Sequence, residues 1–174
     1  MAPSSYQPPT RGDKTDASTR SQSVESNLSH TQTTVSKLLE GKGDAVFAVR
    51  PTETIHSVVI TLRDKRIGAV VVTDQNGTLL GILSERDIVR RMADTPGQTL
   101  PQSVEDLMTR EVKTCAPGDL LNDVLKTMTE GRFRHMPVIS DGKLHGVITI
   151  GDVVHFRLKE LEYEALRMKQ MIVG

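Results

Sequence analysis

Residues 146–152 read Gly-Val-Ile-Thr-Ile-Gly-Asp, a pattern typical of a buried strand that runs into the first turn of a helix. Thr149 stands where an N-cap residue is expected, because a hydroxyl there accepts a hydrogen bond from a free backbone N–H. Asp152 follows three residues later, where an acid suits the positive end of the helix dipole. Helix capping alone would explain one Thr-x-x-Asp of this kind.

The same pattern occurs 65 residues earlier, as Gly-Ile-Leu-Ser-Glu-Arg-Asp at residues 81–87. Upstream of both copies the spacing becomes 66 residues, so that Pro51 corresponds to Pro117 and Arg66 to Arg132. The lost residue falls in a turn, where Asp-Gln-Asn-Gly becomes Ser-Asp-Gly, and turns tolerate deletions best. An internal repeat of this kind predicts two copies of one structural unit.

Composition narrows the class of protein. The 174 residues are enough for a domain with its own core, and equal numbers of basic and acidic residues, 22 each, give no basic field for nucleic acid. The single cysteine fits a reducing compartment, so we expect a cytoplasmic protein. No apolar run reaches the roughly 20 residues that span a bilayer, and residues 1–34 lack the apolar core of a signal peptide. We therefore expect neither a membrane nor a nucleic acid as partner.

Composition and the repeat together divide the chain into five predicted regions. The first is rich in Ser, Thr, Gln and Pro, and it cannot bury enough apolar surface to offset its ordering entropy. The regions are a disordered tail at residues 1–33, the first repeat at 34–95, a Pro- and Gly-containing linker at 96–103, the second repeat at 104–157 and a C-terminal helix at 158–174.

Each repeat predicts the order strand, helix, strand, strand, helix, with a short helical piece in front. Pro51 and the expected N-cap Thr52 lead the first long helix, and Asn76-Gly77 predicts a hairpin turn. The buried face of that helix is predicted from the 3.6-residue spacing of Ile55, Val58, Val59 and Leu62. The expected strands are 46–49, 69–73, 79–83, 112–115, 136–139 and 143–148. The other expected helices are 35–39, 84–92, 104–108, 119–130 and one from 152 onward.

This arrangement resembles a tandem pair of CBS (cystathionine-β-synthase-type) domains over residues 35 to about 157. Four stretches carry the resemblance: 67–74, 80–87, 132–139 and 146–152. The chain is most similar to small stand-alone CBS-pair proteins with a short C-terminal helix. The resemblance implies an α/β fold of the α+β type, in which two β-α-β-β-α units pack as a pseudo-two-fold disc. It also implies two clefts, each able to take an adenosine nucleotide.

The chemistry of the repeated motif agrees with that implication. A hydroxyl and free N–H groups at a helix N-terminus can seat a phosphate, and a carboxylate one turn later can accept hydrogen bonds from two ribose hydroxyls. Ser84 with Asp87, and Thr149 with Asp152, supply these groups twice. We therefore expect a ligand in both clefts, with plain helix capping as the alternative.

A basic cluster precedes the central strand of the second repeat: Arg132, Arg134 and His135. In similar proteins this cluster lies where phosphates from both clefts converge, and Arg134 could bind phosphate as a fork with His135 as a second donor. The alternative is a solvated arginine pair with His135 bonded to backbone. Arg86, at a helix start, either reaches phosphate or is plain surface.

The resemblance also places the adenine against apolar backbone. It puts Ile67, Gly68 and Ala69 on one cleft wall and Phe133, Arg134 and His135 on the other. The expected core residues behind these walls are Val70, Val71, Val138 and Ile139.

Catalytic and metal sites are not indicated. The five histidines have no partners at metal-ligand spacing, and Cys115 aligns with Val49, which favours a buried structural thiol over a nucleophile. No motif places a nucleophile with its base. We expect a protein that is not an enzyme and that has neither a metal nor a catalytic cofactor.

Two functions remain open from the sequence. The first is a regulatory module that senses AMP, or ADP, ATP or NAD, and acts on an unknown target protein. The second is a protein-interaction adaptor, for example a regulator of a redox or metabolic enzyme, whose clefts are vestigial. Similar plant proteins are thought to act on thioredoxin-type partners, which supports the second. The presence of both Ser/Thr-x-x-Asp motifs favours the first.

An apolar stripe runs along the C-terminal helix. A free helix of this length is marginal in water, so the stripe must be buried against either the rest of the chain or a second copy. A two-fold contact would let each stripe meet its copy, and we predict a homodimer. The stripe consists of Leu158, Leu161, Ala165, Met168 and Ile172, spaced like the a and d positions of a coiled coil.

Overall fold

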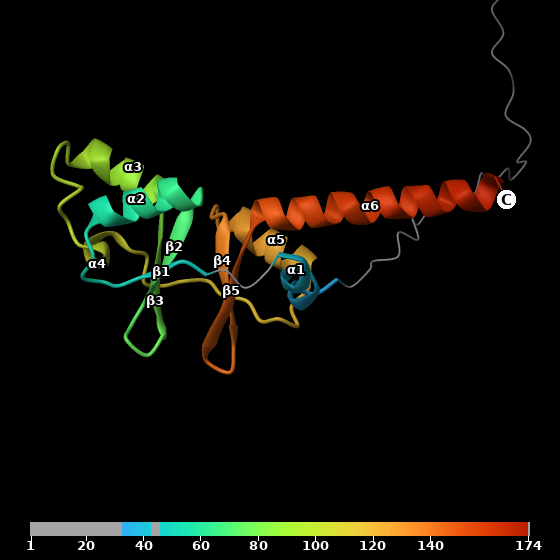
Figure 1. The fold of residues 1–174 in the computed structure, drawn as a ribbon, viewed down its shortest axis with the longest axis horizontal. Helices are drawn as coiled ribbons and strands as arrows, with labels where there is room; N and C mark the ends of the chain where they lie inside the picture. The colour runs from blue at the N-terminus through green and yellow to red at the C-terminus, as the bar shows by residue number, and fades with distance from the viewer. Residues whose placement is uncertain (1–32, 43–45, 174) are drawn as a thin grey trace, which may run out of the picture. The chain divides into compact units, whose positions relative to one another are not determined.

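A computed structural model describes residues 33–42 and 46–173, which belong to one compact unit (Figure 1). The tail predicted to be disordered lies outside the described residues, apart from Thr33. In chain order the elements are α1 (Val35–Lys42), β1 (Ala48–Val49), α2 (Ile55–Lys65), β2 (Ala69–Thr73), β3 (Leu79–Ser84), α3 (Glu85–Asp94), α4 (Val104–Leu107), α5 (Leu121–Glu130), β4 (His135–Ser140), β5 (Lys143–Thr149) and α6 (Ile150–Val173).

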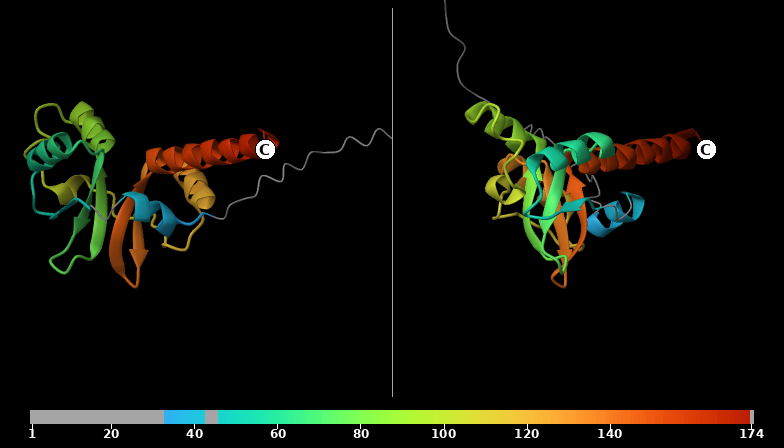
Figure 2. Two further views of the ribbon diagram at one scale, coloured as in Figure 1. Left: turned by 45° about the vertical axis from the view of Figure 1, so that its right-hand side comes forward. Right: turned by 60° about the vertical axis from the view of Figure 1, so that its left-hand side comes forward.

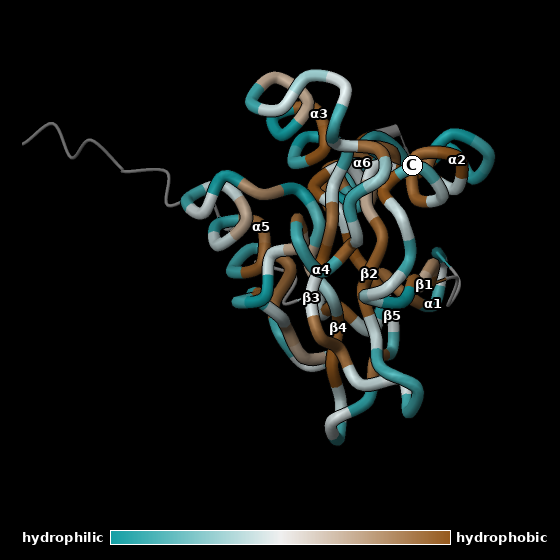
Figure 3. Tube along the Cα trace, turned by 90° about the vertical axis from the view of Figure 1, so that its left-hand side faces the viewer, coloured by the Kyte–Doolittle hydropathy of each residue, from teal (hydrophilic) through white to brown (hydrophobic). Residues whose placement is uncertain are grey.

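The predicted mixed α/β repeat is confirmed. The order α2-β2-β3-α3 returns as α5-β4-β5-α6, and Figure 2 shows the two antiparallel hairpins side by side. Strand β1 pairs with β2 in parallel and makes the first sheet three-stranded. In Figure 3 the strands are hydrophobic and the hairpin tips hydrophilic, as expected for strands that carry the core and turns that face water.

Strand pairing places the two capping residues at matching points. Ser84 lies opposite Ala69 at the end of the first hairpin, and Thr149 lies opposite His135 at the end of the second. The next backbone N–H in each case bonds across the hairpin, Glu85 to Gly68 and Ile150 to Arg134. Each helix therefore begins beside the residues that lead into its own central strand.

The strand predicted at 112–115 is wrong, because it shrinks to a single parallel bridge between Cys115 and Val138. Pro137 explains the loss. In the first repeat the corresponding residue, Val71, donates its N–H to the carbonyl of Phe47 at 3.1 Å. Proline has no N–H to donate, so the second sheet cannot extend its parallel ladder.

Two details of the predicted helix α2 are also corrected. The N-cap is Thr54 and not Thr52: its hydroxyl accepts from the N–H of Ser57, and the carbonyl of Gln102 takes the N–H of Ile55. The linker thus satisfies orphan donors of the helix start and shifts that start by two residues. Val59, expected on the buried face, is 38% exposed.

The predicted hairpin turns are confirmed by their backbone geometry. Gly77 has φ +83°, and the carboxylate of Asp74 accepts the N–H groups of Asn76 and Thr78. The shorter second turn places Asp141 and Gly142 at φ 50° and 73°, the left-handed pair that a two-residue hairpin requires.

The short helices are exchanged between the two repeats. Helix α1 precedes the first repeat, but Val35, Leu38 and Leu39 are buried in the core of the second. Helix α4 precedes the second repeat, but Val104 and Met108 are buried in the core of the first. Each repeat therefore contributes a helix that covers its neighbour. Val70, Val71 and Val138 are buried as predicted, and Ile139 is half-buried.

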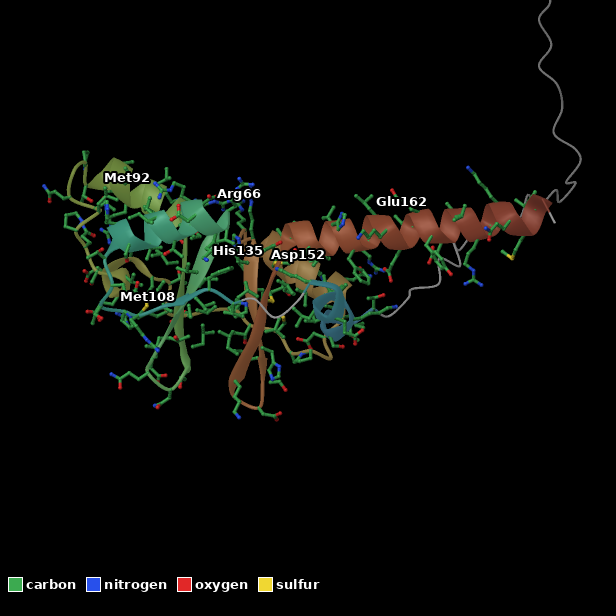
Figure 4. All side chains as sticks on the ribbon, in the orientation of Figure 1. Arg66, Met92, Met108, His135, Asp152 and Glu162 are labelled. Atoms are coloured by element: carbon green, nitrogen blue, oxygen red, sulfur yellow. The ribbon has the colours of Figure 1, made fainter. Side chains whose placement is uncertain are left out.

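Helix α6 runs out past α5 and α1 in Figure 1. Val153, in its first turn, is fully buried, while Leu158, Leu161 and Met168 are 51–54% exposed and Ile172 is 84% exposed. The described part of the chain therefore does not bury the apolar stripe, and the alternative in which the stripe packs on the protein's own two repeats is wrong. Figure 4 labels Glu162 on this outer part of the helix.

No helix within residues 33–42 and 46–173 is long and apolar enough to cross a membrane. The cytoplasmic location stays a prediction.

Candidate functional site

A cavity of about 300 Å³ lies beside the start of α3, and we call it the first cleft. Eight of the twelve predicted site residues line it, and they come from both repeats. They are Gly68, Ser84, Arg86, Asp87, Arg132, Phe133, Arg134 and His135. The structure thus brings the motif of the first repeat together with the basic cluster of the second.

The other four predicted residues lie elsewhere. Ile67 packs against the first core and Ala69 opens β2, so of that predicted wall only Gly68 reaches the cavity. Thr149 and Asp152 belong to the equivalent position in the second repeat, where the resemblance implies the other cleft, and we call this position the second cleft.

The motif of the first cleft is a complete capping box. The Asp87 carboxylate accepts from the Ser84 hydroxyl at 2.5 Å and from the Ser84 N–H at 3.1 Å, and the Ser84 hydroxyl accepts from the Asp87 N–H at 3.4 Å. All these bonds to the carboxylate reach one oxygen, Oδ2. Among the described residues no other group bonds Asp87, so its carboxylate faces the cavity with acceptor capacity to spare.

The charge around the first cleft is predominantly positive. Five basic side chains face three acidic ones, and the Arg86 guanidinium donates to the backbone carbonyl of Arg132 at 3.0 Å, linking the two repeats. Such a lining suits an anion, because clefts with one dominant sign of charge focus the field. The basic residues are Arg86, Arg90, Lys113, Arg132 and Arg134, and the acidic ones Glu85, Asp87 and Glu111.

Four of these charged residues were not predicted from the sequence: Glu85, Arg90, Glu111 and Lys113. Arg90 lies one helical turn after Arg86 and therefore on the same face of α3, a spacing that could have revealed it. Glu111 and Lys113 come from the segment between α4 and Cys115. Thr109, in the same segment, also lines the cavity. No pattern in the sequence distinguishes that segment from an ordinary linker.

His135 lies between the two clefts. A Cβ at Gly68 would come within 3.1 Å of the His135 Nε2, so only glycine lets the ring approach this closely. Burial lowers the pKa of the His135 imidazole; Glu85 and Asp152 oppose this shift, and Lys42 and Arg134 add to it. Figure 4 shows His135 and Asp152 close together where β4 meets the start of α6.

Two arginines hold an unusual backbone conformation at equivalent positions. Arg66 and Arg132 have φ 54° and 56°, a left-handed region that costs a side-chain-bearing residue about 1–2 kcal/mol relative to glycine. Arg132 is the one that lines the first cleft. Strain of this kind is common where a side chain is needed at a functional site.

The second cleft repeats the capping box but adds a lysine. The Asp152 carboxylate accepts from the Thr149 hydroxyl and N–H, both at 2.8 Å. It also accepts from the Lys42 ammonium at 2.5 Å, and the same ammonium donates to the Val147 carbonyl at 2.7 Å. Burial raises the pKa of the Asp152 carboxyl, but the hydrogen bonds from Lys42 and Thr149 outweigh it, so the pKa lies below its ordinary value.

The Cys115 thiol does not line the first cleft. Cys115 is buried in the second core, as predicted, and burial together with the nearby Asp119 raises the pKa of its thiol to about 12, so the thiol stays protonated near neutral pH. Within the described ranges, no three His, Cys, Asp or Glu side chains gather as a metal site. The expected absence of a metal stays a prediction.

A family model described as "CBS domain" matches residues 44–94 and 104–159, the two repeats. The chain belongs to the CBS-domain family. The solved CBS-domain containing protein ATU1752 from Agrobacterium tumefaciens is 45% identical and superimposes with a TM-score of 0.70, over 72% of this chain and 99% of that one. The mitochondrial CBS domain-containing protein CBSX3 of Arabidopsis thaliana is 31% identical over 150 residues, 82% of this chain and 73% of that protein.

One solved structure with the same CBS-pair fold contains ligands. The CBS domain pair of protein MJ0100, in complex with 5′-methylthioadenosine and S-adenosyl-L-methionine, has a TM-score of 0.66 and 22% identity, over 74% of this chain and 98% of that one. At this identity the likeness shows the fold alone. The chain spans only 38% and 65% of the length of two other relatives that it matches.

Proposed function

We propose that this CBS pair is a non-catalytic regulatory module that binds an adenosine nucleotide, AMP or else ADP, ATP or NAD, in its first cleft. One observation carries the proposal: a single cavity of about 300 Å³ gathers a helix N-terminus, the carboxylate of Asp87 and five basic side chains. A helix N-terminus and basic side chains suit phosphate, and the carboxylate suits ribose.

Each group has a role in this proposal. Asp87 accepts hydrogen bonds from the ribose hydroxyls, while Ser84 and the first N–H groups of α3 hold phosphate. Arg134 and Arg132 add cationic contacts to phosphate, and Phe133 lies against the base with Gly68. His135 donates an N–H in its neutral form, which its lowered pKa favours near pH 7.

The ligands of the similar CBS pair support the adenosine part of the proposal. Both 5′-methylthioadenosine and S-adenosyl-L-methionine contain adenosine and neither contains phosphate. The basic lining of the first cleft argues for a phosphate in addition, because its five cations outnumber its three carboxylates and bare adenosine would leave the excess positive charge unmatched. Nucleotides should therefore bind better than these two compounds.

Calorimetry with AMP, ADP, ATP, NAD, adenosine and the two compounds above tests the proposal. Asp87→Ala should weaken binding of the best ligand by about 1–3 kcal/mol, roughly five- to 150-fold, because a charge-assisted hydrogen bond is lost. Asp106→Ala is the matched control, since Asp106 forms a capping box of the same kind with Ser103, at the start of α4, but does not line the cavity. Equal losses in both variants, or no binding by any compound, would contradict the proposal.

We also propose that the module is a homodimer in which α6 meets its copy. The stripe on α6 is at least half exposed at Leu158, Leu161 and Met168, and an isolated helix gains stability mainly by packing its apolar face. Leu161→Glu, or deletion of residues 158–174, should reduce the mass measured by light scattering to that of one chain. Glu162→Gln, also exposed on α6, should leave it unchanged.

In the alternative function, that of a protein-interaction adaptor, a partner protein would bind the same exposed stripe. This alternative becomes the better account if the full chain is a monomer and if no compound in the calorimetric series binds. A nucleotide-dependent change in mass would instead connect the cleft to assembly, which is the behaviour of a regulatory module.

A further inference from the structure

The short helices that cover the two clefts occupy equivalent places. The N–H of Val104 bonds to the Glu53 carbonyl at the start of α4, as the N–H of Val35 bonds to the Asp119 carbonyl at the start of α1. A Cβ at Gly81 would meet Met108, and a Cβ at Gly146 would meet Leu39. Met108 and Leu39 are therefore equivalent residues over equivalent strands.

The chain after these two residues differs in length. Cys115 comes seven residues after Met108, whereas its counterpart Val49 comes ten residues after Leu39. Three residues are nearly one helical turn. Helix α4 ends before Met108, while α1 continues beyond Leu39 to Lys42.

This extra turn changes what lies over the cleft. In the first cleft, the Ile82 carbonyl accepts the N–H of Thr109 at 2.9 Å, and the chain that follows lines the open cavity. In the second cleft, the equivalent Val147 carbonyl accepts the Lys42 ammonium, which also bonds Asp152. A cation of the chain itself thus lies where the first cleft is open to a ligand.

We infer that Lys42 is a built-in competitor for the second cleft, so that each chain binds one nucleotide, in the first cleft, unless the last turn of α1 moves. The inference rests on the proposed function and names its regulation. A ribose that approaches Asp152 must displace an ammonium held 2.5 Å from the carboxylate. The Lys42 and Asp152 side chains are 32% and 27% exposed, so water screens the pair and the competitor can be displaced.

Lys42→Met removes the ammonium and keeps a side chain of similar length. Lys37→Met, on the exposed side of the same helix, is the control for the loss of one positive charge and for any change in helix stability. Each variant is titrated with AMP and, in parallel, with ATP by calorimetry, with and without Asp87→Ala, which weakens binding in the first cleft.

The expected results separate this inference from the proposed function. Wild type should bind one nucleotide, and Asp87→Ala should weaken this binding roughly five- to 150-fold, as in the test of the proposed function. Lys42→Met should gain a second site, at least tenfold tighter than any second event in wild type or in Lys37→Met, and this site should survive Asp87→Ala. Wild-type stoichiometry in Lys42→Met would overturn the inference, and so would weaker second-site binding, since Lys42 would then be a ligand contact.

A measurement without ligand tests the Lys42–Asp152 contact itself, whether or not a nucleotide binds. The effects of Lys42→Met and Asp152→Asn on unfolding should be less than additive, because each removes the same pair. Hydrogen exchange at the end of α1 should speed up in Lys42→Met but not in Lys37→Met. Additive effects with unchanged exchange would overturn the contact on which the inference depends.

Discussion

The two clefts contain the same Ser/Thr-x-x-Asp capping box, yet among the described residues only the carboxylate of the second is also bonded by a lysine. The difference does not come from the motif. It comes from the helix that the other repeat supplies, which is one turn longer over the second cleft. In this CBS pair the same motif therefore occurs in two different settings, and we propose that only the first is open to a ligand.

The exchange of α1 and α4 predicts the largest effects. Leu39→Ala and Met108→Ala remove equivalent buried side chains, and each should lower the free energy of unfolding by about 2–4 kcal/mol. Leu39→Ala should speed hydrogen exchange in β4 and β5, and Met108→Ala in β2 and β3. Faster hydrogen exchange in β2 and β3 of Leu39→Ala, with β4 and β5 unchanged, would mean that α1 does not pack on the second repeat in solution.

The two strand glycines give a smaller, unequal pair of effects. A Cβ at Gly81 would lie 2.9 Å from the Thr109 carbonyl oxygen, which is backbone, whereas at Gly146 it would meet only the flexible end of Leu39 at 3.1 Å. Gly81→Ala should therefore lower the free energy of unfolding by about 1–3 kcal/mol. Gly146→Ala should lower it by less than about 1 kcal/mol, because the Leu39 side chain can shift. Chemical denaturation measures the loss of stability in each variant. Equal losses would contradict the proposed difference in how the two clefts are covered.

Phosphate selectivity is the next effect in size. Arg134→Ala should bring the affinity for AMP towards that for adenosine, a loss of about tenfold in the ratio of the two. Arg63→Ala, on the exposed end of α2 with Asp64 as its partner, is the control. If wild type binds adenosine and AMP equally well, the basic cluster does not hold phosphate.

The smallest effect is a pH dependence at His135. Its pKa in the folded protein is lowered, so between that pKa and about 6.5 the unfolded state binds more protons. Stability should therefore fall as the pH drops from about 6.5 through the lowered pKa, and His135→Gln should flatten this slope. In NMR titrations AMP should raise the pKa of His135 and adenosine should not. A slope unchanged in His135→Gln would remove His135 as its source.

Much of the fold was predictable from the sequence. The strands at 69–73 and 79–83 follow from continuous apolar runs, and the capping boxes at Ser84 and Thr149 follow from local spacing. Such features depend on neighbours in the chain, which a sequence displays directly.

What the sequence could not predict depends on contacts between distant segments. The strand at 112–115 fails because Pro137, on another strand, lacks an N–H, and the N-cap moves to Thr54 because the linker bonds the helix start. The exchange of α1 and α4 was hidden because it depends on packing between the two repeats and not on the order of elements along the chain. For the same reason no pattern placed Lys42 against Asp152, or Lys113 in the first cleft.

The first cleft is the one proposed to take the nucleotide, and chemical-shift mapping of the ¹⁵N-labelled chain with AMP measures directly which cleft binds it. We predict that AMP shifts the amide signals of Gly68, Ser84, Asp87 and Thr109 and leaves those of Val147 and Asp152 nearly unchanged. Shifts at Val147 and Asp152, with Ser84 and Asp87 unaffected, would contradict the account.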